Sequence, residues 1–239
     1  MTDKIPTLAA SAVLPRDPST GAFSRRRLLG GLALLPLACL LPTLPVGAAD
    51  TPMQLTAEDK ADLDRIAGYL DGLRSMRARF QQVSSGGQLA FGRIFLRRPG
   101  DLRVEYEPPV PVLLVSDGTW VDYYDSELDQ LTQIPLDQTP IWFLVQQTIA
   151  FSSKITVTAI ERSPGAIRLS LYQTANPDAG SASLTFADDP LALKQWTIRD
   201  SRGTEVLIAL QDAVFGVALP NDLFATPETR RRQNGGKSR

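Results

Sequence analysis

The sequence predicts a mainly β protein whose strands form one antiparallel sheet curled into a barrel. About eleven short strand-like segments follow one another between residues 76 and 213, separated by turn-forming residues. Only two segments carry helical signals. Several strands, such as Leu89–Leu96, are apolar on both faces, whereas a strand with one solvated face should alternate. Something must therefore cover or fill the second face of this sheet.

The first predicted element is an amphipathic helix that begins near Thr56 and ends near Gly72. Threonine is a capping residue, and Glu58 and Asp59 place acidic side chains in the first turn. Apolar residues then recur at helical spacing, at positions 63, 66, 67, 70 and 73. This pattern predicts one helix with a single apolar face.

Alternation with period two and turn residues define the strands that follow. Leu102, Val104 and Tyr106 alternate with charged residues, and Asp117-Gly118 is a hairpin signal between two apolar segments. The predicted strands cover residues 76–81, 89–96, 102–106, 112–116, 120–124, 128–134, 155–160, 167–172, 184–187, 193–199 and 206–213.

A second short helix is predicted at Thr139-Pro140, because threonine caps helices and proline is tolerated at the first helical position. Its body, Ile141–Val145, is apolar on every side. Such a helix could be a lid over an apolar cavity in a half-barrel. A cavity of this kind would suit an apolar ligand. Alternatively, both helices could simply fill the core, and the pattern favours neither interpretation.

The composition excludes several kinds of chemistry. The chain has no histidine and a single cysteine, Cys39, so it can hold no Ser-His-Asp triad, no His/Cys zinc site and no internal disulfide. Its net charge of -1 leaves no electrostatic footprint for nucleic acid. An active site built only of carboxylates remains possible, but the acids around the Asp117-Gly118 turn are explained by turn chemistry. We therefore expect that the protein is not an enzyme and that it binds no metal and no cofactor.

Residues 1–49 are predicted to be a signal peptide. Arginines at 25–27 precede an apolar run from Leu28 to Leu41, and small residues follow at 47–49. Residues 24–29 also fit a twin-arginine signal. Prolines within the run argue against a transmembrane anchor, which needs ~20 apolar residues. We expect export to the periplasm of a Gram-negative bacterium.

Two further predictions concern Cys39 and the C-terminal residues. Leu37-Ala38-Cys39 resembles a lipoprotein acylation site, although Pro36 stands where leucine is usual and the apolar run continues afterwards. Acylation of Cys39 would anchor the protein to a membrane, and this alternative stays open. Residues 229–239 are basic and are expected to form a disordered tail. Residues 50–228 are then the single folded domain.

The order of several motifs resembles that of the periplasmic outer-membrane lipoprotein carrier family, the Lol carriers. No single motif is decisive, but together they cover roughly residues 55–228. The matching segments are Arg79-Phe80-Gln81-Gln82, Arg97-Arg98-Pro99-Gly100, Leu102-Arg103-Val104-Glu105-Tyr106, Pro108-Pro109, Leu114-Val115-Ser116-Asp117-Gly118, Tyr123-Tyr124-Asp125, Asp129-Gln130, Asp200-Ser201-Arg202-Gly203 and Leu219-Pro220-Asn221-Asp222-Leu223-Phe224.

This resemblance implies an unclosed antiparallel barrel with short helices as a lid over an apolar cavity. It also implies a monomeric chaperone that takes acylated lipoproteins from an inner-membrane ABC transporter release complex and delivers them to an acceptor lipoprotein on the outer membrane. Some members of the family carry other cargo, so a periplasmic or Cys39-anchored binder of another lipid with the same fold is the alternative.

The resemblance assigns roles to residues of this chain. Arg98 matches the arginine that holds the lid closed, and Leu102 matches the apolar residue that contacts the transporter. Val104 and Asp122 depart from the family pattern, where aromatic side chains are usual, so the resemblance does not define the lining of the cavity at these two positions. Each candidate could also be ordinary core. The candidate lipid-binding residues are Phe80, Phe91, Phe95, Val104, Tyr106, Trp142, Phe143 and Leu144.

Overall fold

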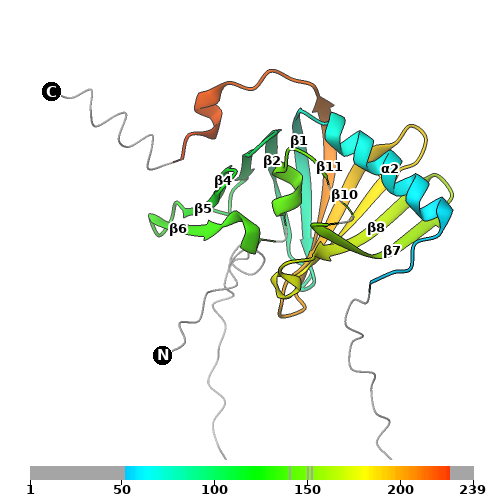
Figure 1. The fold of residues 1–239 in the computed structure, drawn as a ribbon. Coiled ribbons are helices and arrows are strands. Elements are labelled where there is room, and N and C mark those ends of the chain that lie inside the picture. The colour runs from blue at the N-terminus through cyan, green and yellow to red at the C-terminus, as the bar shows by residue number, and fades with distance from the viewer. Residues whose placement is uncertain (1–51, 140, 150, 152, 227–239) are drawn as a thin grey trace, which may run out of the picture.

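One antiparallel sheet forms the body of the protein (Figure 1). The computed structural model describes residues 52–139, 141–149, 151 and 153–226. The predicted signal peptide with Cys39, and the predicted basic tail, lie outside the described residues. Within the described residues, no helix is long and apolar enough to cross a membrane.

The sheet contains the predicted number of strands, and each observed strand overlaps its predicted range. Its order is β6-β5-β4-β3-β2-β1-β11-β10-β9-β8-β7, so β6 and β7 are unpaired with each other and the sheet does not close. The strands are β1 (Ser75–Ser84), β2 (Leu89–Arg97), β3 (Asp101–Tyr106), β4 (Val112–Asp117), β5 (Trp120–Asp125), β6 (Gln130–Pro135), β7 (Ile155–Ser163), β8 (Ala166–Gln173), β9 (Ser181–Ala187), β10 (Ala192–Arg199) and β11 (Glu205–Phe215).

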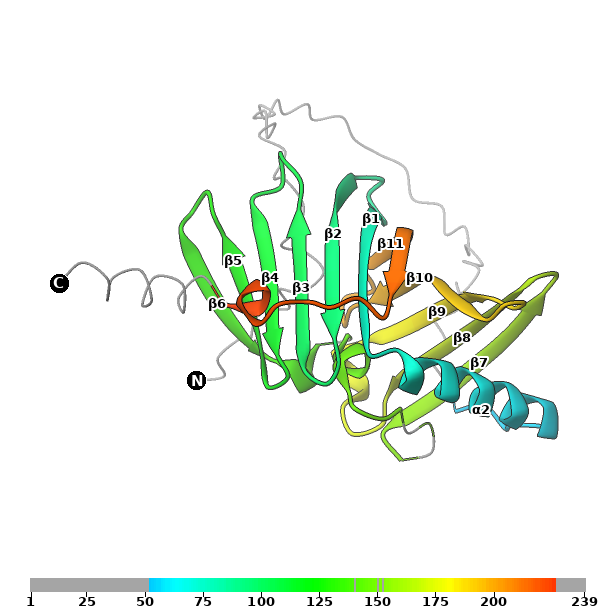
Figure 2. The ribbon, with the colours of Figure 1, turned by 90° about the horizontal axis from the view of Figure 1, so that it is seen from above.

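Two meanders make up this sheet, as Figure 2 shows from above. Strands β1 to β6 follow one another on one side, and β7 to β11 on the other. Antiparallel pairing of β1 with β11, in which Phe80 lies opposite Leu210, joins the two meanders. This pairing links residues about 130 positions apart and brings the start and the end of the sheet together.

The helix α2 (Ala57–Gly72) confirms the first predicted helix. The Thr56 side chain accepts a hydrogen bond from the backbone N–H of Asp59, and the Asp59 carboxylate accepts one from the backbone N–H of Thr56 at 2.9 Å. This capping box satisfies two donors that a helix start leaves free. Leu63, Ile66 and Leu70 turn inward to the sheet and are buried.

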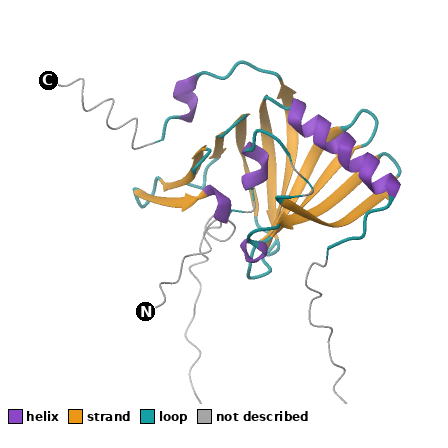
Figure 3. Ribbon diagram, in the orientation of Figure 1, coloured by secondary structure: helices purple, strands orange, loops and turns teal. Residues whose placement is uncertain are grey.

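The second predicted helix is present as a turn of 3-10 helix. It is η2 (Trp142–Val145), and a separate 3-10 turn, η1 (Leu136–Gln138), precedes it (Figure 3). The Thr139 hydroxyl donates to the Leu136 carbonyl at 2.7 Å, so it closes η1 instead of capping η2. This segment has apolar side chains on every side, so tertiary contacts decide its backbone conformation. Short 3-10 turns suit such a segment, because each turn involves only a few residues.

The remaining short helices are η3 (Pro177–Ala179) and η4 (Asn221–Phe224). After β11 the chain runs across the outer face of the first meander to η4, which lies against β3 and β4 (Figure 2). We call the face turned to α2 and to residues 136–149 the inner face, and the opposite one the outer face. The main apolar core lies on the inner face.

Candidate functional site

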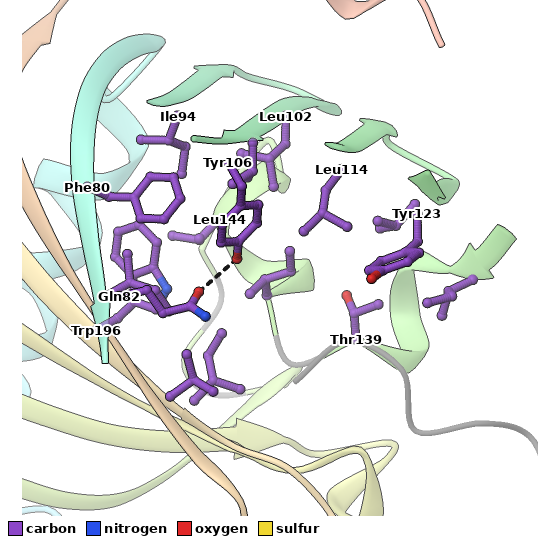
Figure 4. Close-up of a pocket in the computed structure, with 17 residues that line it drawn as sticks. Phe80, Gln82, Ile94, Leu102, Tyr106, Leu114, Tyr123, Thr139, Leu144 and Trp196 are labelled. Carbon is purple, nitrogen blue, oxygen red and sulfur yellow. Dashed lines mark hydrogen bonds between the residues drawn. The ribbon is translucent and has the colours of Figure 1, made fainter. Parts of the chain in front are cut away.

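A pocket lies on the inner face, between the sheet and residues 136–149 (Figure 4). It contains about 830 Å³ of empty space, part of which is open to solvent. Most lining side chains are aliphatic or aromatic. They come from β1 to β6, from β10 and β11, and from residues 136–149: Phe80, Gln82, Ile94, Leu102, Val104, Tyr106, Leu114, Val121, Tyr123, Ile134, Thr139, Ile141, Leu144, Trp196, Ile198, Val206 and Ile208.

The alternation of the strands explains this lining. Side chains on one strand point alternately to the two faces, so Leu102, Val104 and Tyr106 of β3 all point inward. A glycine opposite them opens room for a large ring. A Cβ atom at Gly92 would lie 2.6 Å from ring atoms of Phe80. The missing side chain lets Phe80 reach across β2 and meet Tyr106 edge to face, with ring centroids 5.2 Å apart.

The polar groups of the pocket are few and carry no charge. The Tyr106 hydroxyl donates to Gln82 Oε1 at 2.7 Å. Burial raises the pKa of Tyr106, and the neighbouring Tyr123 hydroxyl adds to this effect. Burial, and then the Asp125 carboxylate, raise the pKa of Tyr123 to about 12. Both phenols are therefore neutral at physiological pH, and the pocket offers a ligand apolar surface with a few uncharged hydrogen-bonding groups.

Four of the eight candidate lipid-binding residues line this pocket: Phe80, Val104, Tyr106 and Leu144. Trp142 and Phe143 belong to the same turn η2 as Leu144, but they do not line it. Phe143 is only 1% exposed and packs within the main core, as Trp142 does. For these two residues, ordinary core packing is what the geometry supports.

Phe91 and Phe95 require a correction, because they lie on the outer face. Phe91 pairs with Gln81, whereas the inward-pointing Phe80 pairs with Gly92. Phe91 is 41% exposed. The sequence does not reveal this placement, since β2 carries apolar side chains on both faces and alternation gives no preference for either set.

Leu102, the expected contact of the transporter, lies on the inner face of β3. Its side chain is 2% exposed and lines the pocket. In this arrangement Leu102 has little exposed surface, and its expected contact with the transporter stays a prediction.

Arg98 lies at the end of β2, where three elements meet. Its side chain is almost fully buried. Nη1 donates to the Leu70 carbonyl in the last turn of α2, and Nε donates to the Gln146 carbonyl just after η2 at 2.5 Å. The Asp71 carboxylate lies 3.9 Å from Nη2. One guanidinium therefore joins α2 to residues 136–149.

The charge of Arg98 suits this position. Burial lowers its pKa, the Asp71 carboxylate raises it in part, and Arg74 lowers it. An arginine pKa starts so high that the guanidinium stays charged. Helix carbonyls of the last turn lack partners within the helix and carry partial negative charge. No basic residue of α2 itself lies in that turn, so Arg98 supplies the missing cation.

The neighbouring Arg97 points to the outer face and has partners of its own. Its Nη1 donates to the Leu219 carbonyl at 3.0 Å and to the Asn221 side chain at 2.7 Å. Its guanidinium also lies 4.7 Å from the ring centroid of Phe224. Arg97 therefore fastens the segment that follows β11, and is not the solvated charge that its place at a strand end suggests.

Sequence reasoning missed most of the second wall of the pocket. Gln82 was visible within the Arg79-Phe80-Gln81-Gln82 motif, because it shares a face with Phe80. The residues of β10 and β11 become neighbours of β1 only through long-range pairing, which has no local signal. The missed residues are Gln82, Ile94, Leu114, Val121, Tyr123, Ile134, Thr139, Ile141, Trp196, Ile198, Val206 and Ile208.

The chemistry of the site is that of binding. A search of the described part of the chain finds no group of three or more carboxylates that could hold a metal ion. The pocket is dominated by apolar side chains, and one buried cation beside it holds two segments together. This arrangement suits the binding of an apolar ligand.

The sequence of this chain is similar to those of a known protein family. The family described as outer membrane lipoprotein carrier protein LolA matches residues 71–227. An outer-membrane lipoprotein carrier protein of Chromohalobacter salexigens is 32% identical over 180 residues, 71% of this chain and 84% of that protein. An uncharacterized protein of Rickettsia prowazekii is 22% identical over 118 residues, 49% of this chain, and the chain spans 55% of its length.

Solved structures are more distant. A LolA superfamily protein from Nitrosomonas europaea is 10% identical and superposes with a TM-score of 0.44, covering 69% of this chain and 98% of that one.

Proposed function

The chain belongs to the outer membrane lipoprotein carrier family LolA, and on this premise we propose that it is a periplasmic carrier of acylated lipoproteins. In this proposal it receives cargo from an inner-membrane ABC transporter release complex and passes it to an acceptor lipoprotein at the outer membrane. It works as a monomer, without catalysis, and its own role is to keep acyl chains out of water during transit.

The uncharged, largely apolar pocket is the observation that carries this proposal. Each CH₂ group that leaves a membrane for water costs ~0.8 kcal/mol, so a carrier must offset most of that cost with apolar surface of its own. The pocket provides such surface from two meanders at once. A ligand of this kind needs no metal and no charged partner inside the pocket.

Arg98 supports a lid made of residues 136–149. Hydrogen bonds to a charged group are each worth ~1.5–3 kcal/mol, and Arg98 makes two, one to each of the segments it joins. Two more bonds act on the same segment: the Gly100 N–H donates to the Val145 carbonyl at 2.9 Å, and the Ile149 N–H donates to Asp71 at 2.8 Å. When the lid opens, these bonds and the buried contacts of Trp142 and Phe143 are exchanged for contacts with cargo, which gives the lid two states.

A transfer assay tests this proposal. Release of a defined acylated lipoprotein from inner-membrane vesicles, and its hand-over to the acceptor, are measured for the wild type, Arg98→Leu and Arg98→Lys. We expect Arg98→Leu to accept cargo but to fail in hand-over, because the lid no longer closes. Arg98→Lys keeps the charge but loses the planar set of N–H donors, so its rate of hand-over should lie between those of the wild type and Arg98→Leu.

The matched control is Arg93→Leu on the same strand. Arg93 is 61% exposed and pairs only with Glu105, at 2.9 Å, so it should not affect transfer. Transfer by Arg98→Leu at the wild-type rate would contradict the latch. Purification of the protein with a different lipid, and no binding of acylated lipoprotein, would instead favour the alternative of a periplasmic or Cys39-anchored lipid binder.

A further inference from the structure

One hydrogen-bond donor in the wall of the pocket has no partner. Trp196 lines the pocket from β10 and is 3% exposed. Its indole Nε1 is buried and makes no hydrogen bond within the described part of the chain. A buried donor without an acceptor costs about 1–3 kcal/mol, so such groups call for an explanation.

A second donor lies close to the first. Gln82 and Trp196 both pair with Ile208, from its two sides, so the three residues form one row across β1, β11 and β10 on the inner face. Figure 4 shows the Trp196 indole and the Gln82 amide side by side in the wall of the pocket. The Tyr106 hydroxyl occupies Gln82 Oε1. The amide nitrogen of Gln82 is therefore the end that is left to donate.

Two neighbouring donors in an apolar wall lack one thing, which is an acceptor. A ligand with a negative charge does not fit, because the lining contains no cation to pair with it. A pure hydrocarbon would leave both donors unpaired. A neutral carbonyl oxygen can accept from both groups, and in acylated lipids such an oxygen lies at the head of each ester-linked chain.

We propose that Trp196 and Gln82 bind the ester carbonyl of an acyl chain and thereby make the pocket selective for acyl lipids over plain hydrocarbons. This inference rests on the proposed function and adds the part of the ligand that is recognised. With the carbonyl at this row, the chain extends along the apolar wall toward Ile134 and Tyr123. Sites of this kind reject analogues that lack the polar atom, because the donors are then left unpaired.

Binding of matched lipids tests this inference. Dipalmitoylglycerol carries ester carbonyls, and dihexadecylglycerol is its ether analogue without them. We expect the wild type to prefer the ester, and Trp196→Phe to lower affinity for the ester by about three- to tenfold while affinity for the ether changes less than about twofold. Trp120→Phe, on the outward-facing position of β5 that is 43% exposed, is the matched control. A synthetic dipalmitoylated lipopeptide shows whether the same preference holds for protein-linked chains.

A second measurement does not depend on the stability of the variant. The indole N–H signal of Trp196 is assigned by its absence in the Trp196→Phe spectrum, and it should move on addition of the ester but not of the ether. Equal losses of affinity for both lipids in Trp196→Phe would overturn the inference. An indole signal that does not move with the ester but moves in Gln82→Leu would also overturn it, because the indole would then already be bound to Gln82. If the wild type binds neither lipid nor the lipopeptide, the proposed function itself fails.

Discussion

Two regions of the inner face of the sheet are covered in different ways. In the helix-covered half, which consists of α2 with β7, β8 and β9, the side chains of Ile66, Leu169, Leu184 and Phe186 are 0% exposed. In the pocket half, which consists of β1 to β6, β10 and β11 with residues 136–139 and 141–149, apolar side chains such as Leu114 and Ile134 are only partly buried and border empty space.

The means of attachment differ as well. α2 is a continuous capped helix whose apolar face packs into the sheet, with Tyr69 edge-on to Phe186 at 5.9 Å between ring centroids. Residues 136–149 are short turns held to the rest of the chain partly by Arg98, Gly100 and Asp71. Detaching α2 would expose close-packed core, and detaching the turns would break these polar bonds and expose the buried side chains of Trp142 and Phe143. We therefore expect the helix-covered half to contribute stability and the pocket half, which borders empty space, to take up the proposed ligand.

Matched Leu→Ala substitutions give the largest expected contrast between the halves. Leu184→Ala should lower the free energy of unfolding by about 2–5 kcal/mol, because it leaves a cavity in packed core. Leu114→Ala should cost less than about 1.5 kcal/mol, because its side chain already borders empty space. Urea unfolding of both variants measures the two values. Equal losses would mean that both halves are packed alike.

Two glycines sharpen the comparison further. A Cβ at Gly92 would lie 2.2 Å from the Glu105 carbonyl oxygen and 2.6 Å from the Phe80 ring, so Gly92→Ala should cost about 1–3 kcal/mol and reduce lipid binding. Gly68 lies in α2 with nothing within 4 Å of the added atom, and Gly68→Ala should stabilise by about 0.5–1 kcal/mol. Thermal unfolding and lipid binding are measured for both. A stable Gly92→Ala variant with normal binding would show that Phe80 does not shape the pocket.

The start of α2 makes the helix-covered half sensitive to acid. Hydrogen bonds from the Thr56 hydroxyl and N–H, and then from Arg162, hold the pKa of Asp59 below its ordinary value of 3.8. A lowered pKa contributes stability that is present above the ordinary value and is lost as the pH falls through the lowered one. The wild type should therefore exceed Asp59→Asn in melting temperature near neutral pH, and this gap should shrink below about pH 4. A gap that is constant with pH would remove Asp59 as the source.

The same contrast explains what the sequence predicts well. Local signals suffice for the Thr56 cap, the Asp117-Gly118 hairpin and all eleven strands, since each depends on residues near in sequence. The order of strands places Phe80, Val104 and Tyr106 together once alternation is applied. Here the periodic pattern and the tertiary packing agree.

Where packing overrides local pattern, prediction fails. The stretch Ile141–Val145 is apolar on every side, so its pattern does not show which side chains are core, and its contacts place Phe143 of η2 in the core and Leu144 at the pocket. Phe91 and Phe95 lie on a strand with two apolar faces, so their direction follows from register and not from composition. Trp196 joins Gln82 only through the pairing of β1, β11 and β10, which has no local trace in the sequence.

Site-specific photocrosslinking tests most directly whether the pocket half holds acyl chains. A benzoylphenylalanine replaces Leu114 in the pocket or Phe91 on the outer face, and the protein is mixed with an acylated lipoprotein or with the same protein lacking its acylated cysteine. We expect crosslinks from position 114 to the acylated form alone, and none from position 91. Crosslinks from position 114 to both forms alike, or from position 91 but not 114, would contradict the account.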